Sequence, residues 1–163
     1  MMIKKLTILF AIVVTSAIAT AGPVSGPAPN FTLQMLGGGQ MSLAEHKGNV
    51  VMVNFWATWC APCRQEMPHL EALHQRYSPL GFTLLGVNVE DDPAGAQAWL
   101  EETPVSFPIL FDPENCVSEL YDVIAMPSTV MIDRQGNMRH LHHGYKPGYE
   151  NEYQNQIRAL IRE

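Results

Sequence analysis

The chain has 163 residues, of which 47% are hydrophobic and 16% charged, and its formal net charge is -6. This length and composition predict one compact domain with its own core, and three cysteines are too few for a small scaffold that depends on disulfides. The ten lysines and arginines are spread along an acidic chain and form neither a basic stripe nor a polybasic patch. We therefore expect no nucleic-acid partner and no binding to anionic lipid.

Residues 1–21 predict a secretory signal sequence. Two lysines precede the apolar run Leu6–Ile18, which is shorter than the about 20 residues that a bilayer-spanning helix needs. Ala19 and Ala21 then give the A-x-A arrangement of a cleavage site. We expect cleavage after Ala21, a periplasmic protein without a membrane span, and an oxidising compartment in which thiols are oxidised or actively kept reduced. Retention of this segment as an anchor is the alternative.

The next segments predict an extended entry to the domain and its first strands. Residues 22–30 are rich in proline and glycine and predict an extended lead-in, so the domain itself should cover 31–163. "FTLQML", "GGG" and "QMSL" predict a small β-hairpin at 31–43. The run "VVMVNFW" at 50–56 is typical of a strand that is buried on both faces of a sheet.

A helix is predicted to begin near Ala61. Its apolar residues recur at intervals of three and four and mark one face: Met67, Leu70, Leu73 and Tyr77. Four charged residues are expected to face water: Arg64, Glu66, Glu71 and Arg76. Pro68 lies inside this helix and should bend it.

The rest of the chain alternates between strands and helices. Buried strands are predicted at 82–89 and 108–111, and an antiparallel strand pair at 128–144. Helices are predicted at 93–102, 114–123 and 149–163. This order predicts an α/β fold in which helices cover both faces of a mixed central sheet.

Cys60 and Cys63 stand two residues apart where the buried strand turns into the first helix. The unpaired amides and the dipole at a helix N-terminus favour negative charge, so Cys60 should ionise readily. Cys63, one turn further in, should be more buried and less ionised. We expect Cys60 to attack a partner's disulfide and Cys63 to resolve the mixed disulfide. Pro62 has no N–H to donate to the Cys60 thiolate, and its fixed φ suits the first turn of the helix. The Ala61–Pro62 pair should therefore tune the reduction potential of the two cysteines.

The stretch "FWATWCAPC", on a strand followed by a helix that contains proline, resembles the thioredoxin superfamily. "GPAPNFTL", "GVNVEDDP" and "MPSTVMIDRQGN" are similar to its extracytoplasmic TlpA/ResA-type thiol:disulfide reductases, from about Pro27 to the C-terminus. The resemblance implies a thioredoxin fold, a redox-active Cys60/Cys63 disulfide, and no cofactor or metal. It also implies a cis bond between Met126 and Pro127 facing the active site, where the Met126 backbone could pair with an extended substrate strand.

Two positions depart from the family pattern: Asn54, and Cys116, which the usual motif set does not include. Asn54 stands where cytoplasmic thioredoxins have a buried acid, and an amide cannot exchange a proton at neutral pH. In the resemblance, Asp91 matches an acid that TlpA/ResA-type proteins use instead, with Glu90 beside it. An acid that exchanges protons with the cysteine pair at neutral pH needs a pKa that burial has shifted. Alternatively the acids form a solvated loop in which Asp92 caps the helix that starts at Pro93.

Two tryptophans and the third cysteine also have predicted places. Trp56 is expected in the core, whereas Trp59 should shield Cys60 and offer partners a contact surface. Cys116 is expected to be a small buried hydrophobe in a helix. The alternative for Cys116 is an intermolecular or regulatory disulfide.

Three other interpretations compete with a redox couple. A purely structural disulfide is disfavoured because so short a loop removes little entropy from the unfolded chain. A copper-handling thioredoxin-fold metallochaperone would use Cys60, Cys63 and one histidine of the "HLHHG" segment, but His140 and His143 are too close in sequence for a usual zinc motif. A peroxiredoxin-like peroxidase would normally have a threonine where Ala57 stands.

The sequence therefore favours a periplasmic thiol:disulfide oxidoreductase that reduces protein disulfides through Cys60 and Cys63. Its expected partners are protein thiols and disulfides, with apocytochrome c among the candidate clients. The resemblance also implies a membrane thiol reductase as electron donor. The direction of electron flow depends on the reduction potential relative to those of the partners, which the sequence leaves open.

Overall fold

The computed structural model describes residues 25–163, so the predicted signal sequence at 1–21 lies outside the described part of the chain. Within that part, eight strands form one sheet in the order β1-β8-β7-β4-β5-β6-β2-β3. The strands are β1 (Gly26–Pro27), β2 (Thr32–Met35), β3 (Gln40–Ser42), β4 (Val50–Trp56), β5 (Phe82–Asn88), β6 (Ile109–Phe111), β7 (Ser128–Ile132) and β8 (Asn137–His143). The α-helices are α1 (Ala61–Tyr77), α2 (Pro93–Glu102), α3 (Cys116–Leu120) and α4 (Tyr149–Arg162), and the short 3₁₀ helices are η1 (Leu43–His46) and η2 (Ser78–Leu80).

The centre of the sheet is parallel and its outer strands are antiparallel. β4 pairs in parallel with β5, and β5 with β6. On the other side of β4, β7 and β8 continue the sheet as antiparallel pairs. All seven residues of β4 are buried, which explains why this strand reads as a nearly continuous apolar run. Parallel neighbours need crossover connections, and α1 and α2 supply them. The predicted mixed sheet is confirmed.

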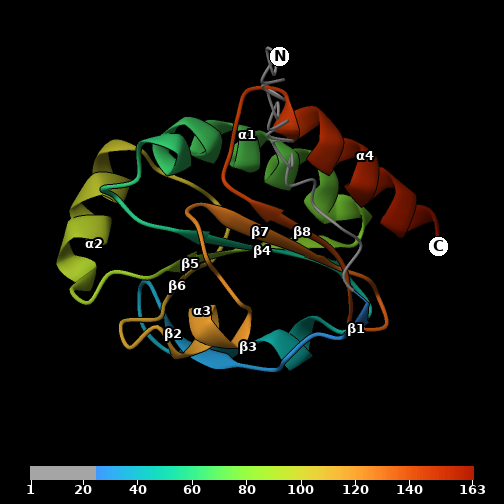
Figure 1. Ribbon diagram of the computed structural model, residues 1–163, viewed down its shortest axis with the longest axis horizontal. Coiled ribbons are helices and arrows are strands. Elements are labelled where there is room, and N and C mark those ends of the chain that lie inside the picture. The colour runs from blue at the N-terminus through green and yellow to red at the C-terminus, as the bar shows by residue number, and fades with distance from the viewer. Residues whose placement is uncertain (1–24) are drawn as a thin grey trace, which may run out of the picture.

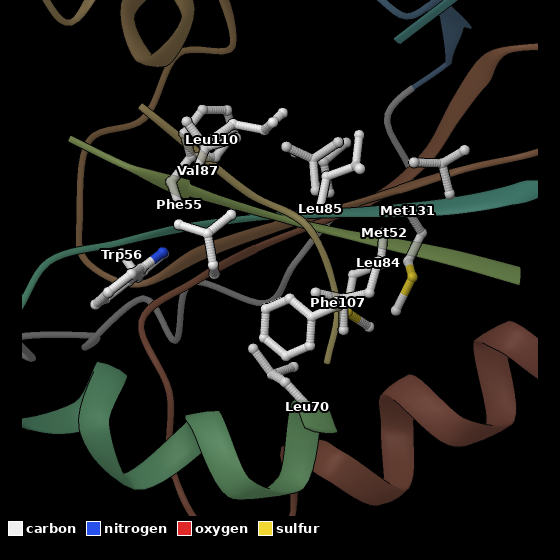
Figure 2. Packing of buried hydrophobic residues seen from close by; sticks show 14 of the residues in the cluster. Met52, Phe55, Trp56, Leu70, Leu84, Leu85, Val87, Phe107, Leu110 and Met131 are labelled. Atoms are coloured by element: carbon white, nitrogen blue, oxygen red, sulfur yellow. The ribbon is translucent and has the colours of Figure 1, made fainter. Parts of the chain in front are cut away.

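The sheet is covered on both faces. In Figure 1, α1 and α4 lie together on one face, and α3 lies on the opposite face. Figure 2 shows Leu70 reaching from α1 toward Phe107 and the sheet. The predicted apolar face of α1 is buried, as are three residues of α4: Tyr153, Ile157 and Leu160. None of the helices within residues 25–163 has the length and apolar character needed to cross a bilayer.

One residue of α1 differs from the prediction. The sequence pattern assigns Glu66 to the side that faces water, but only 1% of its surface is exposed. Cys63, Glu66, Met67 and Leu70 are three or four residues apart, so they project from the same side of the helix. The buried stripe of α1 is therefore wider than its apolar residues indicate, and it includes an acid.

The N-terminal strands lie at the two edges of the sheet. β1 pairs with β8 at one edge, and β2 pairs with both β6 and β3 at the other. The turn between β2 and β3 contains Gly37–Gly39, whose φ angles lie between 81° and 100°, a region that glycine adopts without strain. The Tyr121 hydroxyl donates to the Pro29 carbonyl at 2.6 Å. This bond ties the chain before β2 to the end of α3.

Candidate active site

Cys60 and Cys63 form a disulfide at the start of α1, with an Sγ–Sγ distance of 2.03 Å. Cys60 is the N-cap of the helix, and its Sγ accepts a hydrogen bond from the Cys63 N–H at 3.1 Å. The first sulfur therefore lies among the unpaired amides of the helix start, as the sequence predicts. Cys63 is 1% exposed and Cys60 5% exposed, so the second cysteine is the more buried of the two.

A hollow in the surface gives access to Cys60. It has a volume of about 530 Å³, and its lining includes Cys60, Pro62 and Met126. The Met126–Pro127 peptide bond is cis, as predicted, and Pro127 is buried directly before β7. Trp59 also lines the hollow and is 67% exposed, so it projects toward solvent beside the disulfide. Trp56 is 1% exposed and lies in the core, as predicted.

Glu90 holds the turn that precedes the cysteine pair. Its carboxylate accepts hydrogen bonds from the Thr58 N–H at 2.9 Å and from the Thr58 hydroxyl at 2.6 Å. The Asn88 side chain donates a third bond to it at 2.8 Å. On the other side of the same residue, the Arg64 guanidinium donates to the Thr58 carbonyl. Both backbone polar groups of Thr58 are thus fixed by side chains, directly before Trp59 and Cys60.

The other two acids of the "EDD" segment have different surroundings. Asp92 is the N-cap of α2 and accepts from the Ala94 N–H at 2.9 Å, as the alternative interpretation of this loop expects. Asp91 is exposed, and within residues 25–163 it has neither a hydrogen bond nor an ion pair. Its carboxylate lacks the burial that a proton-relay role requires.

Glu66 is the buried acid of this region. The Tyr153 hydroxyl donates to Glu66 Oε1 and the Asn54 Nδ2 donates to Oε2, both at 2.8 Å. Burial raises the pKa of Glu66 from 4.5 to about 7, and the two hydrogen bonds oppose part of that rise. Asn54 also donates to the Thr129 hydroxyl at 2.9 Å, so the network reaches β7. In the sequence, the only signal for this site is that Glu66 falls on the helix face of Cys63 and Leu70.

A sequence model of the AhpC/TSA family matches residues 24–141. This chain belongs to the AhpC/TSA family. The thiol-disulfide oxidoreductase ResA of Geobacillus kaustophilus is 35% identical over 122 residues, which cover 75% of this chain and 70% of that protein. The thioredoxin-like protein YneN of Bacillus subtilis is 38% identical over 120 residues, which cover 72% of this chain and 69% of that protein.

Solved structures agree with these relatives. The crystal structure of a Chlorobium tepidum protein assigned as thiol:disulfide interchange protein DsbE superposes with a TM-score of 0.82 at 33% identity, covering 85% of this chain and 97% of that one. This member of the AhpC/TSA family therefore has a thioredoxin-like α/β fold, and it is a thiol-disulfide oxidoreductase. The names of ResA and of the Chlorobium tepidum protein both refer to thiol and disulfide chemistry.

Cys116 is exposed rather than buried, so the expected core position is wrong. It opens α3, and the next two residues, Val117 and Ser118, take the buried positions while their N–H groups donate to the Asp112 carboxylate. Partial desolvation, together with the carboxylates of Glu114 and Asp112, raises the pKa of the Cys116 thiol. A smaller fraction of this thiol is therefore in the thiolate form at neutral pH than for an ordinary exposed cysteine.

The histidines of β8 do not join the cysteine pair. His142 is buried, and its Nε2 lies 3.0 Å from Gln156 Oε1 on α4. His143 points the other way, with its Nδ1 3.0 Å from the Ser128 hydroxyl. Within residues 25–163 no group of three or more His, Cys, Asp or Glu side chains is arranged to hold a metal ion. The ligand set of the copper alternative is therefore not brought together.

Proposed function

We propose that this oxidoreductase acts in the periplasm and reduces disulfides in other proteins, with Cys60 as the attacking thiolate and Cys63 as the resolving thiol. The observation that carries the proposal is the asymmetry of the pair: Cys60 lines a surface hollow at the amide-rich start of α1, whereas Cys63 is buried behind it. The predicted signal sequence at residues 1–21 supports the location.

The reaction would proceed in two exchanges. The Cys60 thiolate attacks one sulfur of the client disulfide, the client S–S bond breaks, and the departing client thiolate takes up a proton. Cys63 then loses its proton and attacks the Cys60 sulfur, which forms the Cys60–Cys63 disulfide and releases the second client thiol. Two electrons pass from the cysteine pair to the client. A membrane thiol reductase would return the pair to its reduced form.

Glu66 is the group that we assign to the second proton transfer. It follows Cys63 by one helical turn on the buried side of α1, where side chains three residues apart are neighbours. With its pKa raised to about 7, the carboxylate is partly ionised at neutral pH and can both take a proton from a thiol and release it. Glu66 therefore replaces Asp91 as the proposed relay.

Met126 offers the client a place for its backbone. The residue stands next to the cis bond at the hollow that Cys60 lines, and within residues 25–163 neither its N–H nor its carbonyl has a backbone partner. An extended client segment could form main-chain hydrogen bonds there while its disulfide lies against Cys60. Such pairing is independent of client sequence and suits several clients, of which apocytochrome c is one candidate.

Trapping of the mixed disulfide tests the proposal. The full-length protein with Cys63→Ser, in a Cys116→Ser background, should accumulate periplasmic adducts that dithiothreitol releases, because the resolving thiol is absent. The matched control adds Cys60→Ser and should accumulate none. Trapped proteins identified by mass spectrometry would name the clients. A reduction potential of the purified pair below that of each released client would establish the reducing direction, and a higher potential would contradict it.

A further inference from the structure

Two hollows of similar size adjoin each other at the active site. The first has a volume of about 530 Å³ and contains Cys60, and the segment 123–126 lines it with apolar side chains. The second has the same volume of about 530 Å³, and its lining includes three consecutive acids, Glu90, Asp91 and Asp92. Trp59 and Met126 line both hollows. These two side chains therefore stand between an apolar half and an acidic half of one surface.

The apolar half is unusually exposed. Ile124 is 75% exposed and Trp59 67% exposed, the two highest values among the large hydrophobic side chains of residues 25–163. Exposed apolar side chains that gather beside a reactive group are typical of a contact surface for a partner. Because any client must bring its sulfur to Cys60, this half of the surface lies directly in the path of the client chain.

The acidic half has one carboxylate that is not engaged elsewhere. Glu90 binds Thr58, and Asp92 caps α2, so both are held by their own chain. Asp91 is exposed and has no such partner among the described residues. Neither lysine nor arginine lines this hollow. Three carboxylates without a lining cation give the hollow a negative potential that attracts positive charge.

We propose that this surface selects extended client segments that have an aliphatic residue on one side of the reactive cysteine and an arginine or lysine on the other. The proposal rests on the proposed function, because that function brings the client cysteine to Cys60. A strand advances about 3.3 Å per residue, so side chains within two residues of that cysteine reach both hollows. The aliphatic side chain covers Ile124, and the basic side chain pairs with Asp91. An acidic residue in the same place would be repelled.

A matched set of peptides tests this preference. Each short peptide has a single cysteine, linked as a mixed disulfide to 2-mercaptoethanol, with leucine on one side and either arginine or glutamate on the other. Both orders of the flanking residues are made. Oxidation of the reduced protein by each peptide is followed by stopped-flow tryptophan fluorescence. We expect the second-order rate constant to be about tenfold higher for the better arginine peptide than for its glutamate counterpart at low salt, and this ratio should fall as salt screens the charges.

Charge-reversal variants test whether Asp91 causes the preference for the arginine peptide. Asp91→Lys should abolish or reverse the ratio between the arginine and glutamate peptides. Glu101→Lys makes the same change in net charge at an exposed position on α2, and it should leave the ratio unchanged. Comparing the two peptides within each variant cancels any general change in the reactivity of Cys60. Equal rates for the two peptides, or equal effects of the two variants, would overturn the proposal.

Two further measurements complete the test. Ile124→Ser should reduce the preference for leucine over serine in the aliphatic position, and an unchanged preference would contradict that half of the proposal. Bis(2-hydroxyethyl) disulfide is small and neutral, so its reduction by the wild-type protein depends on the cysteine pair alone. If that reaction fails, the proposed function is wrong. If it proceeds while the peptides are not distinguished, only the proposed client preference is wrong.

Discussion

At the scale of single residues, Glu66 places a carboxyl group in the interior of the protein. Burial disfavours its charged form, and the hydrogen bonds from Tyr153 and Asn54 recover only part of that cost, so its pKa rises to about 7. The same property that suits the acid to proton exchange with a thiol therefore makes the folded state less stable when the group is ionised.

This pKa predicts a specific dependence of stability on pH. The ordinary pKa of 4.5 applies to the unfolded chain, so between 4.5 and about 7 the folded protein retains a proton that the unfolded chain has released. The contribution of Glu66 to the unfolding free energy should fall as pH rises through this window, by at most about 3 kcal/mol, and stay constant above it. Between pH 5 and pH 8, the unfolding free energy measured in urea should fall less for Glu66→Gln than for the wild-type protein. The same loss in both proteins would contradict the buried titration.

At the scale of elements, the turn between β4 and α1 is held by contacts from outside itself. Glu90 follows β5, yet its carboxylate accepts hydrogen bonds from the N–H and the hydroxyl of Thr58. Arg64 of α1 donates a hydrogen bond to the Thr58 carbonyl. A turn between a strand and a helix would otherwise be free to move. These bonds fix the direction in which Trp59 and Cys60 leave the sheet.

Removing the Glu90 carboxylate should loosen this turn. Glu90→Ala leaves the partly buried Thr58 N–H without its acceptor, so we expect the unfolding free energy to fall by about 1 to 3 kcal/mol. Glu90→Gln retains an acceptor oxygen, so it should lower the unfolding free energy by less than Glu90→Ala does. Urea denaturation of both variants checks the order. Equal stability of Glu90→Ala and wild type would show that the contact contributes nothing net.

The centre of β5 depends on the absence of a side chain. A Cβ atom on Gly86 would lie 2.8 Å from Ile109 Cδ1 and 2.9 Å from Phe107 Cε2, closer than real contacts allow. Gly86→Ala should therefore lower the unfolding free energy by about 1 to 3 kcal/mol. Thermal unfolding followed by circular dichroism measures the change. As a control, a Cβ atom on Gly95 of α2 would meet only Glu90 Oε1, at an ordinary contact distance of 3.9 Å. Gly95→Ala should therefore be neutral or stabilising.

At the scale of the whole molecule, the site is assembled where the carboxyl end of β4, the start of α1 and the segment before β7 converge. β4 and β7 are neighbours in the sheet, and this pairing brings the Met126–Pro127 bond near the cysteine pair. Figure 1 shows α1 and α4 together on one face of the sheet. The Tyr153 hydroxyl of α4 donates to Glu66 of α1, so the C-terminal helix contributes to the same site. The cysteine pair, its proposed proton acceptor and the proposed client surface are thus brought together by one sheet and the helices packed on it.

The sequence by itself determined the features that depend on neighbouring residues. Strands and helices follow from apolar periodicity over a few positions, and the placement of Cys60 at a helix start follows from the change of period after Trp56. The resemblance added the cis bond at Pro127, because a short motif carries it. Each of these properties is encoded within one element or one turn.

Only the tertiary structure decided which polar groups are buried and with what partners. Glu90 meets Thr58 across 32 residues, Asn54 meets Thr129 across 75, and Glu66 meets Tyr153 across 87. Helical spacing shows that Glu66 shares a face with Leu70, but a charged residue there is ordinarily assigned to water unless its distant donors are known. Likewise, the exposure of Cys116 depends on how α3 rests on the sheet. Burial is a property of the packed chain, because the surface that covers a residue comes from elsewhere in the sequence.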